Sequence, residues 1–146
     1  MPEDSWAGLA DAFADGAYAT VKGRVRTYVL HEQLLRHLPA PPASVLDVGG
    51  GAGHQSLPLA RLGYRVTIAD SSPAMLAKAE HRLRAEPAAV RDGVRLIEAD
   101  GVSAPEAVGG ERFAAVLSHG VLMYRRGPSR CSTRCAGASR PAGRSR

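Results

Sequence analysis

The segment Ser44-Val-Leu-Asp-Val-Gly-Gly-Gly-Ala-Gly53 decides the fold of this chain. Its first half is rich in valine and leucine, which predicts a short buried strand over 44–48. Asp47 sits near the carboxyl end of that strand, and four glycines follow in a loop that has almost no side-chain bulk. Such a loop lets a nucleotide-like ligand lie directly against the backbone.

The spacing of these glycines separates two kinds of nucleotide ligand. A dinucleotide fold requires Gly-x-Gly-x-x-Gly, with a helix N-terminus aimed at a pyrophosphate. Here the spacing is Gly49-x-Gly51-x-Gly53, and His54 takes the third glycine position of the dinucleotide pattern. Asp47 beside the loop would repel a diphosphate but suits a ligand that carries an ammonium or sulfonium group. The charge pattern therefore favours S-adenosylmethionine over NAD, and a glycine turn without a ligand is the remaining alternative.

Strand patterns and helix patterns alternate outward from this segment, which predicts an α/β fold with a parallel sheet wrapped by helices. The expected strands cover residues 44–48, 65–69, 94–98 and 113–117. The expected helices are one marked by Val21, Val25, Tyr28, Val29, Leu35 and Leu38, one over about 54–62, and one capped by Ser72 with the stripe Met75, Leu76, Ala79 and Leu83. Pro73 suits the first position of that last helix.

Several motifs in this order resemble the class I S-adenosylmethionine-dependent methyltransferases, from about Ala12 to Tyr124. The segments VLDVGGGAG, RVTIAD, VRLIEADG and FAAVLSHGVLMY are similar to the family's first four strands and the loops that follow them. The resemblance implies a Rossmann-like sheet with strand order 3-2-1-4 and a ligand at the carboxyl ends of the strands. An upstream segment, Tyr18 to Arg26, further resembles the subgroup that methylates the carboxyl of 5-carboxymethoxyuridine in tRNA.

The resemblance assigns the cofactor, S-adenosyl-L-methionine, to the loops that follow the first three strands. Gly49 and Gly50, with Gly51 in the same loop, are expected beneath its methionine portion. Asp47 is expected either to orient the cofactor's ammonium group or only to tie down the glycine turn. The remaining contacts implied by the family are the ribose at Asp70, with helix capping as the alternative, and the adenine at Gly101 and Val102, beside a turn-forming Asp100.

Two further residues are expected to contact the cofactor. Arg26 matches the arginine that grips the cofactor's carboxylate in the tRNA-modifying subgroup, a task that suits a bidentate guanidinium. His119 follows the fourth strand and is expected on the sulfonium side, as a hydrogen-bonding group or a general base. Tyr18 and Lys22 are candidates for a lid over the same site. Methyl transfer is a direct displacement, so no covalent catalytic residue is expected.

The net charge of +5 comes from the C-terminal tail. Seven of the 19 basic residues are arginines within 125–146, which holds no acid, so residues 1–124 carry a net charge of −2. Cys131 and Cys135 lie in the same tail without further ligands of zinc spacing, so no metal site is expected. The chain has no apolar run of membrane-spanning length, and acidic residues stand where a signal peptide needs basic ones, so a cytoplasmic location without membrane contact is expected.

The tail over 125–146 contains no valine, leucine, isoleucine, methionine or aromatic residue, so it is expected to be disordered and to add no strand. Residues 1–124 then form the N-terminal part of a methyltransferase domain with an incomplete sheet. All tail residues have codons with G or C at the second position, which suggests a frame shift near Arg125 in a GC-rich gene. A genuine basic extension that binds nucleic acid or membrane is the alternative.

Three classes of function follow from the sequence. The first is a methyltransferase that acts on a modified tRNA uridine or on a small molecule. The second is a noncatalytic truncated fragment that binds S-adenosylmethionine or nothing, and the third is an NAD-binding oxidoreductase. The methyl acceptor is not specified by these residues.

Overall fold

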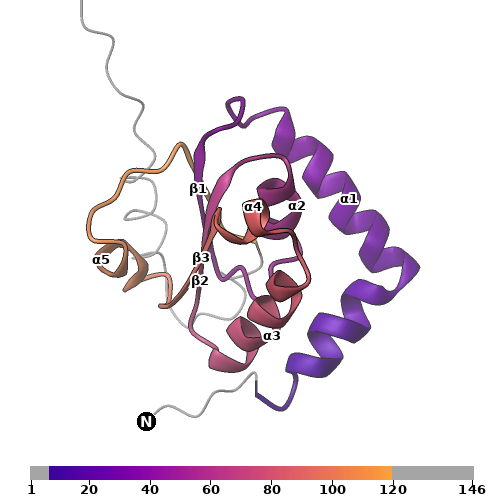
Figure 1. Ribbon diagram of the computed structural model, residues 1–146. Coiled ribbons are helices and arrows are strands. Elements are labelled where there is room, and N and C mark those ends of the chain that lie inside the picture. Colours follow the sequence, from indigo (N-terminus) through magenta and orange to yellow (C-terminus); the bar gives the residue numbers. More distant parts are fainter. Residues whose placement is uncertain (1–6, 120–146) are drawn as a thin grey trace, which may run out of the picture.

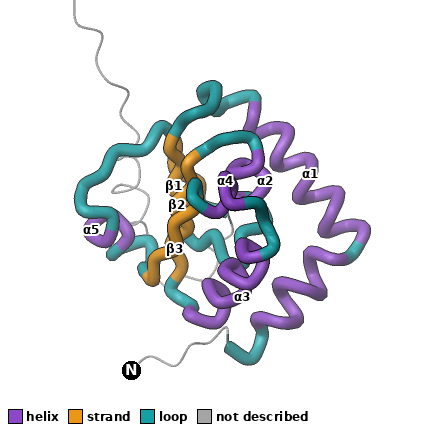
Figure 2. Tube along the Cα trace, in the orientation of Figure 1, coloured by secondary structure: helices purple, strands orange, loops and turns teal. Residues whose placement is uncertain are grey.

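A computed structural model describes residues 7–119 of the chain, and within this range four parallel strands form one sheet. The strand order is β3-β2-β1-β4, which confirms the predicted arrangement. Figure 2 shows the strands at the centre, between helices and loops. The strands are β1 (Ser44–Val48), β2 (Arg65–Asp70), β3 (Val94–Glu98) and β4 (Ala115–Leu117).

The helices form unequal layers on the two faces of this sheet (Figure 1). One face is covered by α2, α3 and α4, with α1 beyond them as an outer layer, and the other face carries the short α5. The helices are η1 (Ala12–Ala17, a π-helix), α1 (Val21–Leu35), α2 (Ser56–Arg61), α3 (Pro73–Arg84), α4 (Ala88–Arg91) and α5 (Ala104–Ala107).

Alternation along β1 divides the core between the two faces. Val45 packs with Leu59 of α2 and Ala79 of α3, whereas Leu46 and Val48 pack with Phe113 and the α5 side. Because side chains of a strand point alternately to opposite faces, Asp47 shares the α2 face with Val45. The strand therefore delivers a buried carboxylate directly beneath the loop that follows it.

The structure confirms the predicted start of α3 and revises the role of the apolar stripe on α1. Ser72 caps α3, because its Oγ accepts the Met75 N–H at 3.3 Å, and Pro73 takes the first helical position. On α1, only the carboxyl-terminal part of the stripe, with Leu35 and then Leu38, packs against the core. The other four predicted core residues of this helix are exposed: Val21, Val25, Tyr28 and Val29.

The bounds of three elements differ from the prediction, and β2 differs only in ending at Asp70 rather than Ala69. β4 begins at Ala115 rather than Phe113, because pairing with β1 starts where Val45 meets Ala115, and Phe113 packs below the sheet instead. α2 begins at Ser56 rather than near His54, since the glycine loop needs the intervening residues for its turns. The four-residue helices α4 and α5 were not expected, because they are too short to show periodicity.

Candidate functional site

The glycine loop after β1 is built by backbone contacts to β2 and by the absence of side chains. The Gly49 N–H donates to the Ala69 carbonyl at 2.6 Å, which fixes the loop against the end of β2. Gly51 has φ +55°, a conformation that favours glycine, and a Cβ there would lie 2.8 Å from Cε of Met75. Residues 49–53 therefore form a close-fitting turn whose upper surface is backbone.

Asp47 lies under this loop as a buried carboxylate. Its side chain is 2% exposed and accepts a hydrogen bond from Oγ of Ser56 at 2.6 Å. Burial raises the pKa of Asp47, while the Ser56 hydrogen bond and the charge of His119 act in the opposite direction. A Cβ on Gly50 would lie 2.7 Å from Oδ2 of Asp47, so the loop rests directly on the carboxylate. This geometry supports the second alternative for Asp47, the tie-down of the glycine turn.

Asp70, at the end of β2, links two loops at the carboxyl edge of the sheet. Its Oδ2 accepts the Gly51 N–H at 2.9 Å, and its Oδ1 accepts the Ser72 N–H at 2.9 Å. The carboxylate is partly exposed, beside the glycine loop and the start of α3. The structure therefore brings the predicted ribose-binding acid to within hydrogen-bond distance of the predicted methionine-binding loop.

The loop after β3 is organised by the Asp100 side chain. Oδ1 of Asp100 accepts the N–H groups of Val102 and Ser103, both at 2.8 Å. Gly101 is buried and Val102 is partly exposed within this turn. The contacts make Asp100 a turn-forming residue, and they leave the backbone of Gly101 and Val102 as the predicted adenine-facing part of the loop.

Arg26 and His119 are supplied by different elements, α1 and the segment that follows β4. His119 follows β4, is exposed, and lines a cavity of about 420 Å³ with Leu30 and Gln33 of α1. Arg26 is exposed on α1, one turn before Leu30 and so on the same helical stripe. The structure thus places Arg26 on α1, whereas His119 lies two residues beyond Leu117, the strand partner of Asp47.

One cavity among the described residues was not predicted from the sequence. We name it the N-terminal cavity; its volume is about 620 Å³, and η1, α1, α2 and α3 supply its walls. Among its lining residues are Asp15, Tyr18, Arg24, Tyr28, His31, His54 and Arg82. Tyr18 was predicted only as part of a lid, and His54 only as a departure from a glycine pattern. Composition gave no signal for this cavity, because its residues are far apart in the sequence.

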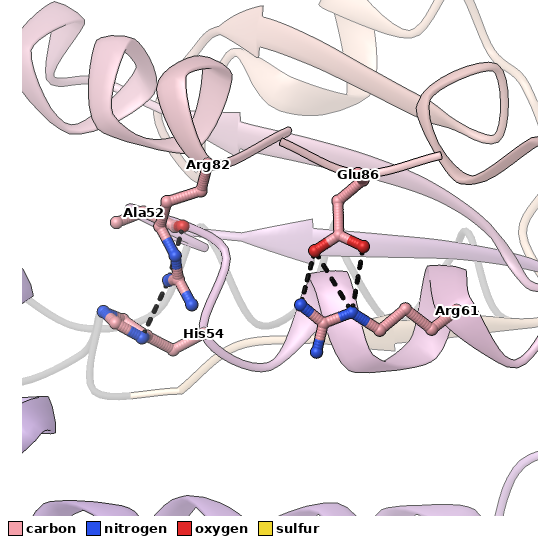
Figure 3. Close-up of polar contacts among 5 residues, drawn as sticks. All are labelled: Ala52, His54, Arg61, Arg82 and Glu86. Atoms are coloured by element: carbon pink, nitrogen blue, oxygen red, sulfur yellow. Dashed lines mark hydrogen bonds and ion pairs between the residues drawn. The ribbon is translucent and has the colours of Figure 1, made fainter. Parts of the chain in front are cut away.

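Arg82 of α3 connects this cavity to the glycine loop (Figure 3). One of its guanidinium nitrogens donates to the Ala52 carbonyl at 3.0 Å and lies 2.8 Å from Nδ1 of His54. Because a guanidinium only donates, Nδ1 of His54 is the acceptor. The imidazole stacks on the Tyr18 ring, with 3.8 Å between ring centroids. Figure 3 also shows the neighbouring Arg61–Glu86 ion pair, which ties α2 to the end of α3.

Within 7–119, no three His, Cys, Asp or Glu side chains gather as metal ligands, and the two cysteines lie outside that range. No helix of the described part is long and apolar enough to cross a membrane.

Most of the chain matches one known sequence family. The family described as "Methyltransferase domain" matches residues 45–143. The match includes the four strands and their loops, and it continues past Tyr124 into residues that the structure does not describe.

Individual relatives agree with this family. The chain is 34% identical over 93 residues to an uncharacterized methyltransferase, YodH, of Bacillus subtilis, which covers 64% of this chain and 37% of that protein. It is 35% identical over 106 residues to a ubiquinone biosynthesis O-methyltransferase of Cereibacter sphaeroides, which covers 73% of this chain and 40% of that protein. The chain therefore spans about two fifths of the length of these curated relatives.

Solved structures share the fold. The glycopeptide N-methyltransferase MtfA in complex with S-adenosyl-L-methionine aligns with a TM-score of 0.62 at 26% identity, over 77% of this chain and 47% of that one. A putative S-adenosyl-L-methionine-dependent methyltransferase from Methanococcus maripaludis aligns with a TM-score of 0.68 over 91% of this chain and 57% of that one. Because the identity is only 17%, this second alignment supports the fold alone.

Proposed function

The chain belongs to the methyltransferase domain family, and from this premise we propose that it binds S-adenosyl-L-methionine at the carboxyl edge of its sheet and takes part in methyl transfer. The observation that carries the proposal is the pairing of Asp70 with the Gly51 N–H at 2.9 Å. This contact holds an acid and a loop of bare backbone side by side, which is the arrangement that a ribose and an amino-acid chain require together.

The residues present fit this cofactor in size and charge. A Cβ at Gly50 or Gly51 would meet atoms closer than 3.0 Å, so the loop keeps its surface free of side chains. A carboxylate can accept about four hydrogen bonds, so an Asp70 that accepts two backbone N–H groups is compatible with ribose hydroxyls as further donors. The buried Asp47 supports the loop from below, and Gly101 and Val102 offer backbone at the next strand end.

S-adenosyl-L-methionine would supply an electrophilic methyl group, which an acceptor nucleophile takes while the carbon–sulfur bond breaks and its electron pair stays on sulfur. The contribution of this chain is to position the reactants and exclude water, and both effects lower the barrier of a displacement. Arg26 would pair with the cofactor's carboxylate, and His119 would lie on the sulfonium side.

Two acceptors are supported by different observations. The segment from Tyr18 to Arg26 supports the carboxyl of 5-carboxymethoxyuridine in tRNA. The names of the relatives, which concern ubiquinone biosynthesis and a glycopeptide, support a small-molecule acceptor. Methylation assays with radiolabelled cofactor, using carboxymethoxyuridine-containing tRNA and a panel of small phenols and amines, separate the two.

Calorimetric titration tests the cofactor assignment directly. We expect S-adenosyl-L-methionine and S-adenosyl-L-homocysteine to bind, and NAD to bind much more weakly. Tighter binding of NAD would overturn the proposal and return the chain to the oxidoreductase alternative. Absence of binding by all three would support a noncatalytic fragment.

The composition of residues 125–146 supports a shifted reading frame near Arg125, because 22 residues without a single large aliphatic or aromatic side chain cannot extend the sheet. The family match, which runs to residue 143, favours the opposite expectation of a continuous frame. The nucleotide sequence around the Arg125 codon distinguishes them. If a shifted frame encodes further strands, a chain continued in that frame should transfer methyl groups faster than the 146-residue chain.

A further inference from the structure

The N-terminal cavity has a positive charge that its own walls do not neutralise. Its acid, Asp15, is paired with Lys78 at 2.9 Å, and Lys78 also pairs with Asp11, so these three groups with Arg24 and Arg82 carry a net charge of +1. The guanidinium groups of Arg24 and Arg82 form no ion pair with any carboxylate in residues 7–119. A cation that is partly withdrawn from water gains from an anion placed beside it. The charge of the cavity therefore favours an anionic ligand.

The position of Arg82 strengthens this preference. The Arg82 side chain is partly buried, and burial together with the nearby Arg61 lowers its pKa, while the charges of Asp15 and Glu86 act in the opposite direction. Its guanidinium donates to the Ala52 carbonyl and to the ring of His54, which are both neutral acceptors. A carboxylate from a ligand would be the first full negative charge in contact with this guanidinium.

The walls of the cavity are suited to a flat ring. Tyr18 and His54 form a stacked pair with an interplanar angle of 10°, and Tyr28 adds a second tyrosine ring that is 64% exposed. Aromatic faces stack on planar ligands and bury large area with few rotamers to fix. His31 also lines the cavity, and its buried Nδ1 has no hydrogen-bond partner within 7–119.

We propose that the N-terminal cavity binds a planar aromatic acid, with the acid group at Arg82 and Arg24 and the ring against the tyrosine walls. A volume of about 620 Å³ lies within the usual range of small-molecule sites. The cavity adjoins the glycine loop through Ala52 and His54. If this acid is also the methyl acceptor, that role rests on the proposed function. The binding of the acid to the cavity does not depend on the proposed function.

The test uses the 146-residue chain and a pair of probes that differ in charge but not in shape. We expect calorimetric titration to show binding of 2-naphthoate and at least tenfold weaker binding of the neutral 2-naphthamide. Inorganic phosphate, an anion without a ring, should also bind at least tenfold more weakly. Equal binding of naphthoate and naphthamide, equal binding of phosphate, or no binding of naphthoate would each overturn the proposal.

Matched variants locate the site. Arg24→Gln changes an exposed side chain and should weaken naphthoate binding by about threefold. Arg82→Gln should weaken it by about tenfold, and the affinity of Arg82→Lys should lie between those of the wild type and Arg82→Gln. Arg91→Gln removes an exposed arginine of α4 outside the cavity and should leave the affinity unchanged. Unchanged affinity in Arg24→Gln and Arg82→Gln, with circular dichroism showing folded protein, would contradict the site.

Binding of S-adenosyl-L-methionine is measured on the same samples, so that two failures can be told apart. Naphthoate binding without cofactor binding would leave the cavity assignment standing and remove the proposed function. Cofactor binding without naphthoate binding would remove the cavity assignment and leave the proposed function standing.

Discussion

The loop at the end of β1 and the N-terminal layer of η1 and α1 are held in place by different kinds of interaction. The loop is fixed by backbone hydrogen bonds, by the buried Asp47 and by glycines that contact their neighbours closely. α1 has no fully buried residue and packs on the core only through leucines at its carboxyl end, and the segment around η1 is attached by the ion pairs of Lys78 with Asp11 and Asp15 and by the stack of Tyr18 on His54. The comparison indicates that the loop tolerates little change, whereas the outer layer can separate from the body at low cost.

The largest expected effect comes from adding the same side-chain atom, a Cβ, to one glycine in each region. Gly50→Ala should destabilise the protein by about 3 kcal/mol, because the added Cβ would lie less than 3.0 Å from atoms of Asp47 and Ile68. Gly16→Ala in η1 meets no atom within 4 Å and should leave the stability nearly unchanged. Urea unfolding monitored by circular dichroism measures both. Equal effects would contradict the division into a rigid loop and a loosely attached layer.

Removal of the Asp70 carboxylate tests whether the rigid region is also the ligand-binding one. Asp70→Ala should weaken binding of S-adenosyl-L-methionine by roughly 2 to 3 kcal/mol, the usual loss for one member of a charged hydrogen bond. Glu98→Ala, an exposed acid at the end of the neighbouring β3, is the matched control and should bind as the wild type does. Calorimetry that finds the same affinity in a folded Asp70→Ala protein would remove the ribose assignment.

The buried Asp47 makes the stability of the loop region depend on pH. Its pKa is raised in the folded state by burial, so the folded protein binds a proton more tightly than the unfolded chain. This contribution stabilises the protein at acidic pH and is lost as pH rises from the unfolded pKa, about 3.9, through the raised folded pKa. Asp47→Asn, which keeps an acceptor for Ser56, should flatten the decline of stability over that range. An unchanged pH profile of the unfolding midpoint would contradict the assignment.

The smallest expected effect concerns the attachment of the outer layer. Lys78→Ala removes both ion pairs to η1 and should leave global unfolding almost unchanged, because exposed ion pairs contribute little. Limited proteolysis of the N-terminal segment should become faster, and the wild type should approach the variant as salt is added. Arg84→Ala breaks an exposed pair within α3 and serves as the control. A large loss of global stability in Lys78→Ala would show that the layer is integral to the core.

The two regions also differ in how much of them the sequence specifies. β1 was predicted to its exact residues, since an apolar run followed by glycines has few alternatives, and Ser72-Pro73 marked the start of α3 by local chemistry. The outer layer follows from contacts between distant residues, such as Arg82 with His54 and Lys78 with Asp15. No local sequence pattern predicts such contacts. For the same reason, the exposed position of Val21 and Val25 could not be anticipated from a stripe that looks like a core face.

The same limit applies within the candidate site. The glycine loop and the acid at the end of β2 were recognisable from the order of strand, loop and carboxylate. The contact of Asp70 with Gly51 spans 19 positions of the chain, so its hydrogen bond was not visible in the sequence. The role of Ser56 beneath the loop was likewise missed, because a serine near a helix start is usually interpreted as a cap.

The order of the strands in the sheet implies an order of events in folding. Val45 of β1 pairs with Val66, 21 positions along the chain, and with Ala115, 70 positions along. Closing the longer loop costs about 1 kcal/mol more in chain entropy, and the three-residue β4 has few hydrogen bonds to offset that cost. We therefore expect the unit β1-α2-β2-α3-β3 to assemble first and β4 to join it afterwards. In pulsed amide exchange during refolding, protection of β2 should precede protection of β4, so His119 would reach its place only in the last step of assembly.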